Sequence, residues 1–83
     1  MMIDDLKLII SKTIDIKNKE IKPETRITAD LGADYLDMVE IQMAIEDKFK
    51  IDILSDRTVW KMKTVGELAN AVEEKIKKQK VSV

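Results

Sequence analysis

Apolar residues in the first third of the chain recur at helical spacing and then lose that period. Between Ile3 and about Lys17, leucines and isoleucines return every three or four residues with Lys and Asp between them, which predicts an amphipathic helix. Residues 18–33 lack this spacing and contain Pro23 and Gly32, so we expect an irregular connection there. The side chains expected to hold this connection against the core are Ile21, Ile27 and Leu31.

A second helix is predicted from Tyr35 to about Lys48, with Asp34 as its N-cap and Asp37 three residues later as a weak capping box. At about 100° per residue, its core stripe consists of Met38, Ile41, Ile45 and Phe49. A second apolar stripe lies roughly opposite, made of Leu36, Val39 and Met43 and surrounded by Glu40, Glu46 and Asp47. This second stripe either packs on the long connection or the third helix, or is exposed as a binding surface.

The second half of the chain predicts two further helices. The segment from Phe49 to Leu54 alternates like a strand but has no partner run, so we expect an extended connector with buried isoleucines. Ser55 or Asp56 caps a short third helix that runs to about Lys61. The last helix has a capping box in Thr64 and Glu67, an apolar stripe in Val65, Leu68, Val72 and Ile76, and a basic end in Lys75, Lys77 and Lys78. The predicted fold is therefore all-α, a four-helix bundle with three longer helices and one short helix, in one domain spanning 1–83.

The composition excludes several classes of chemistry. The chain contains no Cys and no His, which removes thiol nucleophiles, disulfides, Cys/His metal sites and the usual neutral-pH general base. We therefore expect neither an enzyme nor a metalloprotein. The N-terminus leads directly into Asp4 and Asp5, and no apolar run exceeds three residues, so no signal peptide or membrane span is predicted. We expect a soluble, cytoplasmic protein.

Charge is distributed unevenly along the chain. Residues 29–56 hold eight acids and two lysines, whereas the last 27 residues hold seven bases and three acids. A local acidic field repels phosphate backbones and attracts basic protein surfaces. The middle of the chain is therefore expected to bind proteins and not nucleic acid.

Residues 30–40, D-L-G-A-D-Y-L-D-M-V-E, resemble the signature of the acyl carrier proteins of dissociated bacterial fatty-acid synthesis, which reads D-L-G-A-D-S-L-D. The flanking runs P-E-T-R-I-T-A-D, I-Q-M-A-I-E-D-K-F and K-T-V-G-E-L follow in the expected order, and the similarity extends from about Ile3 to Ile76. The resemblance implies a four-helix bundle that carries acyl chains as thioesters on 4′-phosphopantetheine. In that family the arm is attached to a serine at the start of the second helix.

Carried over by position, the resemblance places Tyr35 at the phosphopantetheine attachment site. The implied partner-recognition surface consists of Asp34, Leu36, Asp37, Val39, Glu40, Met43, Glu46 and Asp47. The implied partners are fatty-acid synthesis enzymes and phosphopantetheinyl transferase, which dock through basic patches. The implied acyl-chain cavity is lined by Ile45, Val59, Met62, Leu68 and Val72, residues that ordinary core packing explains equally well.

Two departures from the family pattern affect function. The oxygen of Tyr35 stands on a rigid ring farther from the backbone than a serine oxygen, so a transferase that positions serine for attack is expected to fail on it. The remaining serines, Ser11, Ser55 and Ser82, do not follow the D-L-G-A-D loop. The third helix reads L-S-D-R-T-V-W-K-M, with Arg57, Lys61 and a lone Trp60 where the family is usually acidic and opened by proline.

Two functional hypotheses follow. The first is an acyl carrier protein that cannot be loaded because its attachment serine is replaced, either by engineering, which the intact flanking residues favour, or in a natural paralogue. The second is an interaction module that docks partners through the second helix without carrying substrate. A monomer is expected, although Tyr35 beside Leu36, Val39 and Met43 offers a surface for self-association.

Overall fold

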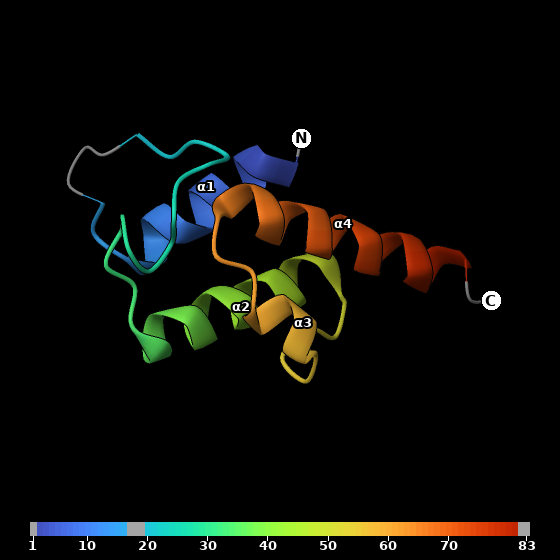
Figure 1. Cartoon of the computed structure of the whole chain (residues 1–83). Helices are drawn as coiled ribbons and strands as arrows, with labels where there is room; N and C mark the ends of the chain where they lie inside the picture. The colour runs from blue at the N-terminus through green and yellow to red at the C-terminus, as the bar shows by residue number, and fades with distance from the viewer. Residues whose placement is uncertain (1, 17–19, 82–83) are drawn as a thin grey trace.

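The computed structural model describes residues 2–16 and 20–81 and contains four helices over this part of the chain. They are α1 (Met2–Thr13), α2 (Tyr35–Phe49), α3 (Arg57–Trp60) and α4 (Val65–Val81), arranged as in Figure 1. The only strand-like pairing among the described residues is an isolated bridge between Arg26 and Thr64. The predicted all-α fold, with three longer helices and one short one, is confirmed.

The first helix ends earlier than predicted. It stops at Thr13, whereas periodicity placed its end near Lys17, which lies outside the described residues. The Thr13 hydroxyl donates to the Ile9 carbonyl at 2.9 Å, a side-chain bond that competes with the backbone pattern of the helix. Two of the next three residues, Ile14 and Ile16, are β-branched and pack against the core outside the helix.

Caps fix the ends of the other helices. The helix α2 ends at Phe49, one residue after the predicted end near Lys48. The next residue, Lys50, adopts a left-handed conformation with φ 57°, and its backbone N–H donates to the Glu46 carbonyl. The Thr64–Glu67 capping box is confirmed, and the backbone N–H groups of Thr64 and Lys63 lower the pKa of the Glu67 carboxyl. The helix α4 extends to Val81, beyond the lysines that were expected to end it.

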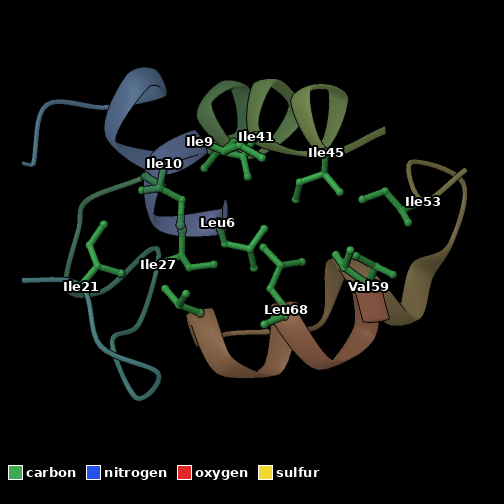
Figure 2. Packing of buried hydrophobic residues seen from close by; sticks show 14 of the residues in the cluster. Leu6, Ile9, Ile10, Ile21, Ile27, Ile41, Ile45, Ile53, Val59 and Leu68 are labelled. Atoms are coloured by element: carbon green, nitrogen blue, oxygen red, sulfur yellow. The ribbon is translucent and has the colours of Figure 1, made fainter. Parts of the chain in front are cut away.

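The core lies between α1, α2, α4 and the long connection. Figure 2 shows side chains from these elements pointing into one interior, and α1 packs against both α2 and α4. Leu6, Ile10, Ile41, Ile45 and Leu68 are completely buried there. The connector after α2 contributes Ile51 and Ile53, as its alternation predicted.

The connection from α1 to α2 is irregular, as predicted, but backbone hydrogen bonds tie it to the start of α4. Gly66 donates to the Pro23 carbonyl at 2.8 Å, and Val65 donates to the Thr25 carbonyl at 3.0 Å. A Cβ at Gly66 would lie 2.9 Å from the Pro23 oxygen, so the close approach requires glycine. The expected anchors Ile21, Ile27 and Leu31 are all buried.

Candidate functional site

The start of α2 is held in place by two local devices. Gly32 turns the chain with a φ of 73°, a conformation that glycine adopts without strain. The Asp34 carboxylate then accepts the Asp37 backbone N–H at 2.9 Å, and the Asp37 carboxylate accepts the Asp34 backbone N–H at 3.0 Å. The predicted capping box is therefore present, and it places Tyr35 as the first residue of the helix.

Tyr35 is 72% exposed, but its ring is not free. It stacks on the ring of Trp60 in α3, with ring centroids 5.6 Å apart and planes inclined by 16°. The Trp60 indole N–H donates to the Leu54 carbonyl at 2.8 Å, which fixes the ring on which Tyr35 rests. The sequence did not predict the contact with Trp60, because a contact between two helices leaves no local periodic signal.

The outward face of α2, defined by Leu36, Glu40, Met43 and Asp47, is exposed. Leu36 and Met43 are 67% and 54% exposed, so neither packs on the connection or on α3. Val39, beside this face, is half-buried. Glu40 makes no hydrogen bond or ion pair with any described residue, and Asp47 makes only an exposed ion pair with Lys50 at 3.8 Å. At the start of the helix, the carboxylates of the exposed Asp34 and the half-buried Asp37 make the hydrogen bonds of the capping box.

Glu46 has a different environment from its acidic neighbours. Its carboxylate accepts the backbone N–H groups of Ile53 at 2.7 Å and Leu54 at 3.0 Å, in a half-buried position. It therefore connects α2 to the segment leading into α3 and has less freedom to meet a partner. Its spacing in the sequence had grouped it with Glu40 and Asp47, and no sequence signal separated them.

Gln42 is the buried polar residue that sequence reasoning missed. Its side chain is completely buried, and neither its amide nitrogen nor its amide oxygen has a hydrogen-bond partner among the described residues. It lies seven residues after Tyr35 and four after Met38, so these three residues share the face of α2 that is directed toward Trp60. An unpaired amide in such a position costs stability and is unsuited to contact with an alkyl chain.

The residues expected to line an acyl-chain cavity lie in two places. Ile45, Leu68 and Val72 are completely buried in the core, where packing explains them. Val59 and Met62 line a groove of about 360 Å³ between α3 and α4. In this groove the Lys75 ammonium lies 2.8 Å from the Asp56 carboxylate and, with the Thr58 backbone N–H, lowers the pKa of Asp56 to about 2.

No group of three or more potential metal ligands occurs among the described residues. The helices of the described chain are also too short or too polar to cross a membrane. The helix α2 begins with a tyrosine and exposes Leu36, Glu40, Met43 and Asp47 along its outward face.

Known proteins are similar in sequence to this chain over most of its length. Residues 4–72 match the family model described as a phosphopantetheine attachment site. An acyl carrier protein from Wolinella succinogenes is 40% identical over 84% of this chain and 91% of its own length. Acyl carrier proteins from Picosynechococcus and Helicobacter pylori are 43% and 34% identical over 87% and 88% of the chain, and over 88% and 92% of their own lengths. This chain belongs to the acyl carrier protein family.

Acyl carrier proteins are carriers and not enzymes, and phosphopantetheine is the usual cofactor of the matching family. The residues at the start of α2 do not fit that group in the way the family attaches it, because Tyr35 presents an aromatic ring stacked on Trp60 in place of a short aliphatic hydroxyl. Ser11 and Ser55 lie elsewhere, donating to the Leu8 carbonyl and the Asp52 carboxylate, and Ser82 lies outside the described residues.

Proposed function

We propose that this chain is an acyl carrier protein that docks carrier-dependent enzymes but is not loaded with 4′-phosphopantetheine. The observation that carries the proposal is the position of Tyr35, which opens α2 with its ring stacked on Trp60. A phosphopantetheinyl transferase must bring the accepting oxygen in line with the phosphate that is transferred. The phenolic oxygen lies at the tip of a ring that the stack holds over α3, so it is displaced from the position of a serine oxygen.

The outward face of α2 supports docking without an attached arm. Exposed Leu36 and Met43 offer an adaptable apolar surface, and Glu40 and Asp47 attract basic patches. We propose that the partners are fatty-acid synthesis enzymes, and that Glu46, which is bonded to Ile53 and Leu54, contributes mainly by positioning the helix. We further propose that the protein acts as a monomer in the cytoplasm.

A carrier-derived interaction module is the second candidate function. The stack of Tyr35 on Trp60 favours it, because a single introduced tyrosine would not be expected to find a matching aromatic partner on α3. In that case both residues belong to a natural paralogue that keeps the docking helix and dispenses with the prosthetic group. The two candidates differ in whether restoring serine restores a functional carrier.

Loading is tested by incubating the chain with coenzyme A and a broad-specificity phosphopantetheinyl transferase, and then measuring intact mass. We expect no mass gain on the unaltered chain and a phosphopantetheine gain on Tyr35→Ser. A gain on the unaltered chain would overturn the proposal that it is not loaded. A loaded Tyr35→Ser protein that accepts no acyl chain would favour the interaction module.

Docking is tested by measuring affinity for a carrier-dependent fatty-acid synthesis enzyme. Changing Glu40 and Asp47 together to Lys is expected to weaken binding by about 1–2 kcal/mol, with a smaller effect at high salt. The matched control is Glu73→Lys, an exposed acid on α4 outside the outward face. An equal loss in the control would show a response to net charge and not a docking surface.

A further inference from the structure

The two departures of this chain from the family pattern, the tyrosine at position 35 and the basic third helix, lie together in the structure. Tyr35 is the only tyrosine of the chain. Its ring stacks on Trp60 with the centroids 5.6 Å apart, so the start of α2 lies beside α3 (Figure 1). The Tyr35 side chain is nevertheless 72% exposed. The stack therefore positions the phenol and leaves it accessible from solvent.

Two cations of α3 border the ring on which the tyrosine stacks. Arg57 lies three residues before Trp60, and side chains on a helix lean toward its N-terminus. The Trp60 indole does so, because its N–H donates to the Leu54 carbonyl at 2.8 Å, and the ring therefore extends back toward Arg57. Lys61 directly follows Trp60, and both line a groove that Met38 of α2 also lines. We refer to Arg57 and Lys61 as the α3 cations.

The α3 cations are free to meet an anion. Arg57 and Lys61 are exposed, and neither side chain makes a hydrogen bond or ion pair with any described residue. The other cations that line the groove are already engaged. Arg26 is paired with the Asp30 carboxylate at 3.1 Å, and Lys63 lies beside the carboxylate that caps α4. Two unpaired cations beside an exposed phenol are suited to hold a doubly charged phosphate on it.

Acidic residues around Tyr35 decide on which side such a phosphate would lie. Asp34 and Asp37 are its neighbours in the chain and would repel a second negative group. Their carboxylates accept backbone N–H groups at 2.9 and 3.0 Å, which keeps them close to the backbone. The acid of α3, Asp56, is paired with Lys75 at 2.8 Å. The rigid ring holds its oxygen away from the capping acids, so a phosphate there is attracted toward the α3 cations.

We propose that Tyr35 is a tyrosine phosphorylation site, and that Arg57 and Lys61 hold its phosphate against α3. A kinase brings the phenolic oxygen to the γ-phosphorus of a nucleoside triphosphate. The new oxygen–phosphorus bond forms as the bond to the β–γ bridging oxygen breaks, the phenolic proton passes to the catalytic base of the kinase, and the nucleoside diphosphate leaves. The phosphate then joins α2 to α3 through charge-assisted hydrogen bonds. This modification requires neither coenzyme A nor a serine.

The first test incubates the full chain with ATP, magnesium and a broad-specificity tyrosine kinase, and then measures intact mass. We expect the gain of one phosphoryl group. Tyr35→Phe keeps an aromatic ring over Trp60 and should gain none, because the chain has no second tyrosine. A folded chain that gains no phosphoryl group overturns the proposal, and so does an equal gain on Tyr35→Phe.

The second test measures whether the α3 cations hold the phosphate. A pH titration of the phosphorylated chain, followed by phosphorus NMR, gives the second ionisation constant of the phosphate. Arg57→Gln combined with Lys61→Gln removes two exposed ion pairs and should lower this constant at least about threefold, with a smaller difference at high salt. Lys12→Gln combined with Lys77→Gln removes two exposed lysines of α1 and α4, and this matched control should change the constant by less than about 1.5-fold.

Circular dichroism confirms that each variant is folded before it is titrated. The role of the α3 cations is overturned if their double variant leaves the ionisation constant unchanged, or if the matched control lowers it equally. Loading with phosphopantetheine and docking at Glu40 and Asp47 are both measured without a kinase. The phosphorylation proposal and the proposed function therefore fail separately.

Discussion

Two faces of α2 carry similar residue types and have different physical roles. On the outward face, Glu40 has no partner among the described residues and Met43 is exposed. On the face toward α3, the Glu46 carboxylate accepts two backbone N–H groups and Gln42 is buried. The comparison shows that the contacts of an acid on α2, and not its place in the helical period, decide whether it takes part in holding the fold together.

The largest expected effect is at Glu46. Changing Glu46 to Ala leaves the N–H groups of Ile53 and Leu54 without their acceptor, and should lower the free energy of unfolding by about 2 kcal/mol. Glu46→Gln keeps one acceptor oxygen and should lose less. Glu40→Ala on the outward face should stay within about 0.5 kcal/mol. Urea titrations of the three variants measure the free energy of unfolding. Equal losses of stability at Glu40 and Glu46 would contradict the different roles of the two faces.

Gln42 should give a gain in stability. Replacing its buried, unpaired amide with Leu removes a desolvation penalty and should raise the free energy of unfolding by about 1–2 kcal/mol. Gln42→Glu, which places an ionisable group at the same position, should be destabilising. Thermal unfolding measures the stability of both variants. A loss on Gln42→Leu would show that the amide is hydrogen-bonded in solution and stabilises the fold.

The Tyr35–Trp60 stack should have a smaller effect. Tyr35→Ser removes one ring of the pair and should cost about 1 kcal/mol, whereas Tyr35→Phe keeps the stack and should cost less. A double-mutant cycle with Trp60→Ala should give a coupling energy of about 0.5–1.5 kcal/mol. Zero coupling would mean that Tyr35 rests on α3 without stabilising it, and that its ring is free to leave the start of the helix.

The last prediction concerns pH and the anchoring of α3. The pKa of Asp56 is lowered to about 2 by Lys75 and the Thr58 backbone N–H, so the folded state binds a proton more weakly than the unfolded state. Its contribution is present above the ordinary pKa of an aspartate and is lost as pH falls from about 4 toward 2. Asp56→Asn keeps a helix-capping side chain and should flatten this part of the stability profile. Glu73→Gln, an exposed acid on α4, should leave the profile unchanged, and acid unfolding curves compare the two.

Sequence patterns predicted the helices where the governing interactions are local. The capping boxes Asp34–Asp37 and Thr64–Glu67 each join residues three positions apart. Their residue types alone therefore locate the starts of α2 and α4. The end of α1 was predicted too late because Ile14 and Ile16 continue the apolar pattern and pack against the core outside the helix. Leu36 and Met43 of the second apolar stripe are exposed and Val39 is half-buried, so the stripe does not pack as a whole on the connection or on α3.

The sequence by itself determined the helical order, the apolar stripes, the family and the tyrosine that follows the D-L-G-A-D loop, because each depends on residue type at short spacing. Only the tertiary structure decided which acids are free, that Gln42 is buried, that Tyr35 rests on Trp60 and that cations line a groove beside them. These features join residues that are distant along the chain, such as Tyr35 and Trp60. Their contacts depend on how the helices pack against one another, and helix packing leaves no periodic pattern in the order of the residues.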